Sequence, residues 1–255
     1  MRLGEVEYEK RDGIAIMTLD DQSKMNALST GIIKGLKEGF DEVEKDDEVQ
    51  IVILTGKGRA FCAGADLSGL ELNPVSMKRF LKELFVTALC RAEKLTKPVI
   101  AAVNGLALGG GLELAISCDI IIASDKAQFG VPEARRGLVP GFAIVRLHQI
   151  VGRNKAKELT MTTDYISADE ALRINLVNKV VPDEKLMDEA IAMASKIVSQ
   201  APLAIQFAKS AYNRELWGED LAYATDGIAM LFGTEDCQEG IAAFLEKRKT
   251  VFKGK

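Results

Sequence analysis

The sequence has very little of the residue on which many hydrolytic and metal-dependent sites are built. Its 255 residues include one histidine, His148. A Ser-His-Asp triad needs a histidine held between two partners, and many catalytic metal sites use several histidines, so a single one disfavours both kinds of site. His148 stands in a segment of apolar periodicity, and we expect a partly buried helix residue there.

The chain also lacks the cysteine patterns that indicate disulfide frameworks or bound metal. Cys62, Cys90, Cys118 and Cys237 show neither metal-ligand spacing nor a secretory context. We therefore expect free thiols in a reducing compartment and no metal. Residues 1–7 do not resemble a signal peptide, and no apolar run reaches the length of a membrane span. These absences favour a cytoplasmic protein with no membrane partner.

Charge and glycine patterns exclude further classes. The formal net charge is -4, and the only short basic runs of note are Arg135-Arg136 and Lys247-Arg248-Lys249, which are too small to indicate nucleic-acid binding. No glycine-rich stretch has the Gly-x-Gly-x-x-Gly spacing of dinucleotide sites or the spacing of a P-loop. With 47% hydrophobic residues the chain can bury a large core, as one domain or as a domain with an appendage.

The most informative stretch runs from residue 99 to residue 115. It reads as a buried strand, a turn at Asn104-Gly105, and three glycines, 109–111, that open an apolar helix. The first N–H groups of a helix lack internal partners, so the Gly110 N–H can bind a ligand oxygen with no side chain in the way. That amide would supply half of an oxyanion hole. Glu113 in the first turn could serve this site, or it could simply cap the helix and offset its dipole.

The remaining pattern predicts alternating strands and helices, followed by a helical last third. A hairpin is expected around Asp12-Gly13, and a helix capped by Ser29 or Thr30. Further strands are expected at residues 49–54, 120–123, 127–130 and 176–181, with long helical regions at 74–95 and 183–253. In the first of these regions the residues expected to face inward are Val75, Met77, Phe80, Leu81, Leu84, Phe85, Ala88 and Leu89.

Two further segments stand where ligands bind in α/β proteins. The small-residue loop 56–67 follows the carboxyl end of a strand, and Glu133 comes just past another strand end, after Pro132. Repeated β–α units with short connections predict a right-handed parallel arrangement.

Taken together, four ordered motifs resemble the enoyl-CoA hydratase/isomerase (crotonase) superfamily over essentially the whole chain. They are residues 60–67 (AFCAGADL), residues 97–113 (KPVIAAVNG followed by GGGLE), residues 128–133 (QFGVPE) and the ending 246–253 (EKRKTVFK). The resemblance implies an α/β fold, a spiral of β-β-α turns with a C-terminal helical trimerisation region. Residues 1–195 would form the core with the active site and residues 196–255 the helical oligomerisation region of a homotrimer or homohexamer.

The resemblance also implies an activity. In the family, two backbone N–H groups stabilise a thioester enolate, and these correspond to Ala65 and Gly110. The hydratase pattern has two glutamates, which correspond to Glu113 and Glu133. Glu113 would orient and activate water, and Glu133 would deliver a proton to the α-carbon of a 2-enoyl-CoA, giving a 3-hydroxyacyl-CoA by syn addition. The partner would be the acyl-CoA thioester, and no cofactor is implied because CoA is part of the substrate.

Contacts to CoA follow from the same resemblance. The backbone at 65–67 would recognise adenine, and Lys24 would lie near the phosphates unless it is an ordinary solvated lysine. Phe252 and Lys253 would come from the C-terminal helix of this or a neighbouring subunit. The full set of expected substrate and CoA contacts is Lys24, Ala63, Ala65, Asp66, Leu67, Gly109, Pro132, Gly141, Phe252 and Lys253.

One departure from the family pattern concerns the acyl group. Many hydratases have a glycine-rich run after the second glutamate, whereas this chain reads Gly141 followed by Phe-Ala-Ile-Val at 142–145. We expect these bulky residues to reshape the acyl end of the pocket. A Δ3,Δ2-enoyl-CoA isomerase, a hydratase of a cyclic or branched (di)enoyl-CoA, and a non-catalytic acyl-CoA- or RNA-binding member are the alternatives. The pair Glu113 and Glu133 argues against lost catalysis, and the net charge of -4 argues against RNA.

Overall fold

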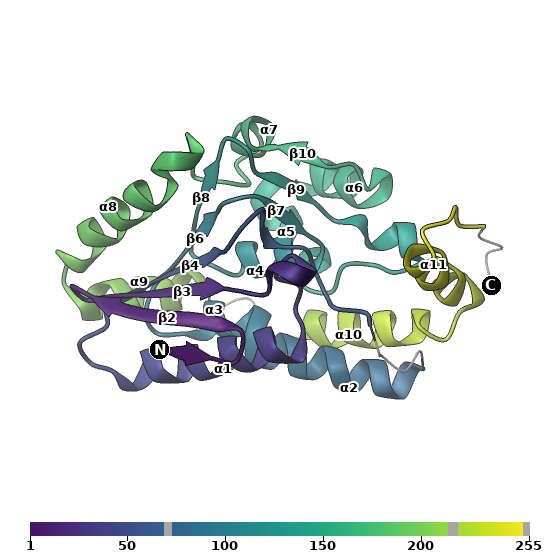
Figure 1. The fold of residues 1–255 in the computed structure, drawn as a ribbon, viewed down its shortest axis with the longest axis horizontal. Coiled ribbons are helices and arrows are strands. Elements are labelled where there is room, and N and C mark those ends of the chain that lie inside the picture. The colour runs from purple at the N-terminus through teal and green to yellow at the C-terminus, as the bar shows by residue number, and fades with distance from the viewer. Residues whose placement is uncertain (69–72, 214–218, 252–255) are drawn as a thin grey trace.

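The fold is built on two β-sheets surrounded by helices (Figure 1), and the computed structural model describes residues 1–68, 73–213 and 219–251. The larger sheet has the order β1-β2-β3-β4-β6-β8-β11, antiparallel from β1 to β3 and parallel from β3 onward. Its strands are β1 (Arg2–Leu3), β2 (Val6–Arg11), β3 (Ile14–Leu19), β4 (Ile51–Gly56), β6 (Val99–Val103), β8 (Ile120–Ser124) and β11 (Lys179–Val181). The smaller sheet has the order β10-β9-β7-β5. Its strands are β5 (Ala60–Cys62), β7 (Leu106–Leu108), β9 (Gln128–Gly130) and β10 (Ile166–Ser167).

Helices follow the strands and fill the C-terminal third. The α-helices are α1 (Thr30–Lys45), α2 (Pro74–Leu84), α3 (Cys90–Lys94), α4 (Gly110–Ile116), α5 (Ala143–Val151), α6 (Arg153–Thr162), α7 (Ala168–Arg173), α8 (Leu186–Val198), α9 (Pro202–Asn213), α10 (Glu219–Leu231) and α11 (Glu235–Leu245). A π-helical turn, η2 (Phe85–Leu89), joins α2 to α3, and 3-10 turns form at η1 (Gln22–Lys24), η3 (Pro132–Arg136) and η4 (Asp183–Lys185). No helix of the described residues is long and apolar enough to cross a membrane.

From β4 to β9, successive strands alternate between the two sheets, which confirms the expected spiral of β-β-α turns. The strands β4, β6 and β8 are neighbours in the larger sheet, and the strands that follow them, β5, β7 and β9, are neighbours in the smaller one. The register carries Ile53 onto Ile100 and Ile100 onto Ile120. Each turn of the spiral therefore brings one strand-to-helix junction to the same end of the smaller sheet.

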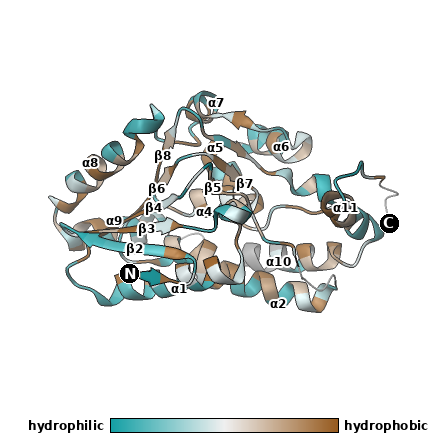
Figure 2. Cartoon of the chain, viewed as in Figure 1, coloured by the Kyte–Doolittle hydropathy of each residue, from teal (hydrophilic) through white to brown (hydrophobic). Residues whose placement is uncertain are grey.

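The core lies on both faces of the larger sheet. Helix α8 covers one face, where its Leu186, Ala190 and Ala194 pack against isoleucines of β3, β4, β6 and β8. The other face packs against α1 and the helices that follow it. Figure 2 shows hydrophobic and hydrophilic residues interspersed along α1 and α8, as expected for helices with one apolar side. Burial of this apolar surface supplies most of the stabilisation of the fold.

Local expectations for the N-terminal third are confirmed. The hairpin turns at Asp12-Gly13, both of which have positive φ, 49° and 78°. Ser29 caps α1, because its Oγ accepts a hydrogen bond from the Ile32 N–H at 3.2 Å. All four cysteines of the chain are free, as expected, and they are buried.

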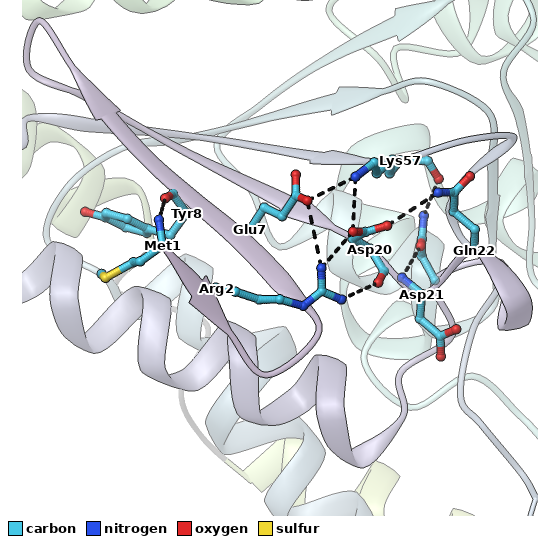
Figure 3. Close-up of polar contacts among 9 residues, drawn as sticks. Met1, Arg2, Glu7, Tyr8, Asp20, Asp21, Gln22 and Lys57 are labelled. Carbon is cyan, nitrogen blue, oxygen red and sulfur yellow. Dashed lines mark hydrogen bonds and ion pairs between the residues drawn. The ribbon is translucent and has the colours of Figure 1, made fainter.

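The loop that connects β3 to α1 is pinned against the loop that follows β4. Buried Asn26 donates from Nδ2 to the Ala60 and Lys57 carbonyls at 2.7 and 3.0 Å. Nearer the surface than Asn26, Lys57 and Arg2 form ion pairs with Asp20 (Figure 3). Exposed pairs of this kind contribute little stability individually, so the buried amide is the stronger tie. These contacts hold residues 20–28 beside the 56–67 loop.

Three expectations about helices are wrong. Val75 is exposed. Successive residues of an α-helix are rotated by about 100° around its axis, so Val75, two residues before the buried Met77, lies on nearly the opposite side of α2. His148 is exposed rather than partly buried, because the buried face of α5 is formed by Ala143 and Leu147. The C-terminal helix ends at Leu245 instead of continuing to residue 253, and Lys247 has a φ of 56° that a helix cannot contain.

Helix α9 is tied to the core by a buried ammonium group. Lys209 Nζ donates to the Ala92 and Lys97 carbonyls at 2.7 and 3.0 Å and to Asp119 Oδ2 at 2.7 Å. Asp119 Oδ2 in turn accepts from the Val99 N–H, where β6 begins. The Lys209 side chain is 5% exposed, so its three donors depend on these partners.

We predict that Lys209→Met lowers the free energy of unfolding by about 1–3 kcal/mol, because it leaves the buried Ala92 and Lys97 carbonyls without their donor and Asp119 without its ion-pair partner. Denaturant unfolding at a fixed protein concentration measures this. Lys196→Met, which removes an exposed lysine of α8, is the control and should change stability by less than about 0.5 kcal/mol. Equal effects of the two substitutions would contradict the role given to the buried ammonium group.

Candidate active site

Three of the four motifs contribute residues to one pocket of about 120 Å³. Its lining includes nine of the residues expected at the site: Ala63, Ala65, Leu67, Gly109, Gly110, Glu113, Pro132, Glu133 and Gly141. They come from the loop after β5, the start of α4, the η3 turn and the residue before Phe142. The spiral places these junctions together, which is why segments far apart in the sequence can share one cavity.

Two backbone N–H groups meet in this pocket. The closeness of the two segments is seen by adding a Cβ atom to their glycines. A Cβ on Gly110 would lie 3.4 Å from the Ala65 nitrogen, and a Cβ on Gly64 would lie 3.6 Å from the Gly110 nitrogen. Among the described residues, neither of these two amides donates to a backbone oxygen. Adjacent, unengaged N–H groups beside an apolar cavity can both bind a single oxygen that carries negative charge.

Close packing of glycines holds the two amides in place. Gly109, the residue before α4, has a φ of 55°, and Gly64 has a φ of 106°, so both adopt conformations that other residues rarely reach. A Cβ at Gly111 would lie 1.9 Å from the Cys62 carbonyl oxygen, which shows how closely α4 approaches the strand β5. The Leu28 N–H donates to the Gly64 carbonyl at 2.8 Å and fixes the loop from the other side.

Glu113 is buried on α4 and is held by backbone donors from a different element. Its Oε1 accepts from the Ala143 N–H at 2.8 Å. Burial raises the pKa of this carboxyl to about 6, against the opposing effect of the backbone N–H groups at 141–143. The hydrogen bond runs to the start of α5 and not to the first turn of its own helix, so the simple capping interpretation does not describe Glu113.

Glu133 lies in the η3 turn with one oxygen unsatisfied. Its Oε2 is buried and has no hydrogen-bond partner in the described structure. Its Oε1 lies against Gly109, where a Cβ would come within 2.9 Å. Burial and then the charge of Glu113 raise the pKa of Glu133 to about 8. Near neutral pH the pocket therefore holds one carboxylate and one protonated carboxyl, a pairing suited to general base and general acid chemistry.

Lys24 lies outside the pocket lining but is linked to it. Its Nζ is 2.7 Å from Asp66 Oδ2, and Asp66 also accepts from Ser68. The loop that carries Asp66 also carries Ala65, so this exposed ion pair lies beside the pocket. Phe252 and Lys253 lie outside the described residues, and their expected contacts stay predictions.

An aromatic residue of the C-terminal segment does line the pocket, and sequence reasoning missed it. Phe244 of α11 contributes to the lining and stacks on Arg136, whose Cζ is 3.9 Å from the ring centroid. Arg136 also lines the pocket. The resemblance covers residues 246–253, and Phe244 lies two residues before it, so the position of α11 was needed to show that this side chain faces the pocket.

The apolar side of the pocket is formed mostly by residues outside the run 141–145. Of that run, only Gly141 lines the cavity, while Phe142 is buried in the core. The expected effect of residues 142–145 on the acyl end stays a prediction. The apolar wall comes from α2, η2, the segment after η3 and the C-terminal helices: Met77, Phe80, Leu81, Leu84, Phe85, Leu138, Val139, Ile228 and Phe232.

Comparisons with known proteins agree over the whole chain. The sequence model of the family described as enoyl-CoA hydratase/isomerase matches residues 9–255. A short-chain-enoyl-CoA hydratase of Clostridium acetobutylicum is 46% identical, covering 98% of this chain and 97% of that protein. A crotonyl-CoA hydratase of Syntrophomonas wolfei is 40% identical, covering 96% of each. Among solved structures, a carnitinyl-CoA hydratase from Mycobacterium avium has a TM-score of 0.87 at 34% identity and covers 99% of both chains.

We predict that Glu113→Gln shifts the protonation midpoint of Glu133 to lower pH, because the substitution removes a neighbouring negative charge that disfavours the ionised form. Infrared titration of the free protein measures this through the carboxyl band that is absent in Glu133→Gln. Glu93→Gln, which removes a buried carboxyl outside the pocket, should leave that midpoint in place. A midpoint unmoved by Glu113→Gln would show that the two carboxyls do not interact.

Proposed function

Because the chain belongs to the enoyl-CoA hydratase/isomerase family, we propose that it catalyses the reversible syn addition of water to a short-chain 2-enoyl-CoA. The product is a 3-hydroxyacyl-CoA. The observation that carries the proposal is the convergence of two unengaged backbone amides with the carboxyls of Glu113 and Glu133 in one pocket. The chemistry needs no cofactor beyond the CoA that the substrate carries.

In the proposed reaction, the Ala65 and Gly110 N–H groups bind the thioester oxygen. Glu113 accepts a proton from water as the water oxygen bonds to C3, and the electrons of the double bond move toward the thioester. The resulting enolate is held by the two amides, an interaction worth about 2.7–4 kcal/mol per donor at such sites. Glu133 then gives its proton to C2. One water has been added, and proton exchange returns each glutamate to its starting state.

The arrangement favours hydration over the alternative reactions. An isomerase needs a single carboxyl to move a proton along the acyl chain, which would leave Glu113 without a task. Here three backbone N–H groups, at 141–143, stabilise the ionised form of Glu113 despite complete burial. A buried carboxylate maintained in this way is suited to act as the base that deprotonates water.

A short acyl group fits the pocket best. The Phe85 ring packs directly on Gly141 and closes one end of the pocket. A Cβ atom added at Gly141 would lie only 2.1 Å from the Phe85 Cζ. The relatives named short-chain-enoyl-CoA hydratase and crotonyl-CoA hydratase support the same substrate class.

Oligomerisation belongs to the proposal as well. We expect residues 196–255 to form the subunit contacts of a homotrimer or homohexamer around a core of residues 1–195. Helix α9 supports this, since Leu203, Phe207 and Tyr212 are more than three-quarters exposed on it. Four free thiols support a reducing location such as the cytoplasm.

The direct test of the activity is loss of the enoyl-thioester absorbance when the protein is added to crotonyl-CoA, with the product identified by mass. We expect rapid loss and the gain of one water. No loss with crotonyl-CoA, together with turnover of a 3-enoyl-CoA, would replace the hydratase by an isomerase.

Substituting either glutamate should separate chemistry from binding. We predict that Glu113→Gln and Glu133→Gln each lower kcat by about 10²–10⁴, because each removes one proton-transfer group. The affinity for a saturated acyl-CoA, measured by calorimetry, should change little. Unchanged kcat in either variant would remove that residue from the mechanism.

Phe85 should limit the length of the acyl chain. We predict that Phe85→Leu raises the ratio of kcat/KM for 2-octenoyl-CoA to that for crotonyl-CoA by about tenfold, because it opens the end of the pocket. Phe40→Leu, the same truncation within the core at α1, should leave the ratio unchanged. An unchanged ratio in Phe85→Leu would place the chain limit elsewhere.

A further inference from the structure

Arg136 is a half-buried cationic group in the pocket that the proposed reaction does not use. It lies three residues after Glu133 in the 3-10 turn η3. A 3-10 helix has three residues per turn, so side chains at i and i+3 lie above one another on one face. Both residues line the same pocket. The turn therefore presents a guanidinium and a carboxyl side by side to the cavity.

The guanidinium is held without being neutralised. The Phe244 ring stacks on its Cζ at 3.9 Å, and Nη1 reaches the Pro132 carbonyl at 3.5 Å, which is at the limit of a hydrogen bond. Its Nε is buried and has no partner in the described structure. No carboxylate within ion-pair distance is found for Arg136 among the described residues, in contrast to Arg146, which pairs with Glu93.

Helix α11 fixes this arrangement from outside. A Cβ at Gly240 would lie 2.6 Å from the Cα of Arg136, so the helix is packed tightly onto the backbone of the turn. Helix α11 thereby sets both the position of the turn and the stacked guanidinium, because Phe244 lies one helical turn after Gly240. A side chain this constrained keeps its charge at one place relative to Glu133.

Few charged groups act on Glu133. Glu113 approaches from α4, and Arg136 from the same turn. Arg135 and the Tyr165 phenol act on Arg136, and Arg135 itself points away from the pocket to Thr163, with bonds of 2.7 and 2.6 Å. At the pocket, α11 presents the uncharged Phe244. Glu113 and Arg136 are thus the two charges that act on Glu133, and they act in opposite directions.

We propose that Arg136 is a positioning residue that sets the protonation equilibrium of the proton donor Glu133, offsetting the effects of burial and of Glu113. This inference rests on the proposed hydratase function. Glu133 must be protonated to deliver a proton and must regain one in each cycle, so too high a proton affinity would slow the transfer and too low an affinity would leave the donor empty. The uncompensated charge of Arg136 holds the equilibrium between these limits.

The sign of the effect follows from the roles. The donor is active when protonated, so kcat/KM falls as the pH rises through the pKa of Glu133. Loss of the positive charge raises that pKa, because a cation favours the ionised carboxylate. The alkaline limb of the pH profile should therefore move to higher pH when Arg136 becomes neutral.

The test compares Arg136→Met, Arg136→Lys and Arg135→Met. We expect Arg136→Met to move the alkaline limb of kcat/KM for crotonyl-CoA upward by about 0.5–1 pH unit, less than for a direct ion pair. Arg136→Lys, which keeps a cation, should leave the limb near its wild-type position. Arg135→Met removes a neighbouring charge that does not face the pocket, and should also leave it there.

A second readout does not depend on turnover. The infrared midpoint of Glu133 in the free protein should rise in Arg136→Met and stay in place in Arg135→Met. A midpoint that does not move, or a kcat/KM that falls equally at every pH, would overturn the proposal and leave Arg136 as a packing residue. Failure of the hydratase function would be seen separately, as a wild-type protein that does not hydrate crotonyl-CoA but still shows the infrared shift.

Discussion

The whole site depends on the contact between the start of α4 and the loop after β5, where two backbone amides converge. Neither amide can be brought there by side-chain chemistry, so the constraint falls on backbone conformation. Gly109 and Gly64 supply the positive φ values, and Gly111 allows α4 to approach the Cys62 carbonyl. The apolar spiral behind them, rather than any strong local interaction, holds these loops in register.

The carboxyls acquire their chemistry from that same packing. Glu113 is placed in the pocket by the helix that carries the Gly110 amide, and its ionised form is supported by the start of α5. Glu133 is placed by a turn packed between the pocket and α11, with one oxygen unsatisfied. Burial alone would push both pKa values upward, and the difference between them comes from what each environment adds. We attribute the division of labour between base and acid to that difference.

Much of the fold and the centre of the site could be predicted from the sequence, because local patterns there are strong and leave few alternatives. The buried strand before Gly105, the cap at Ser29 and the carboxyl after Pro132 all depend on residues near one another in the chain. A resemblance over four motifs then supplied the pairing of Ala65 with Gly110. The structure places both in one pocket, though their catalytic roles stay proposals.

The periphery of the site could not be predicted, for physical reasons. An apolar helix face such as that of α2 has the same periodicity whether it packs against the core or lines a cavity, so Phe85 was assigned to the core alone. The contact of Phe244 with the pocket depends on how α11 packs onto the η3 turn, which the local sequence does not determine. The placement of the Arg136 guanidinium without a carboxylate partner among the described residues depends on tertiary packing and has no sequence signature.

The central claim is that the Ala65 and Gly110 amides polarise the thioester, and the most direct measurement is the carbonyl stretching frequency of the bound substrate. Crotonyl-CoA labelled with ¹³C at the thioester carbonyl would be bound to Glu113→Gln, which should turn over slowly, and followed by isotope-edited infrared spectroscopy. The account predicts a lower carbonyl frequency in the complex than in water, because two preorganised donors draw charge onto the oxygen. A frequency equal to or above that in water would contradict it.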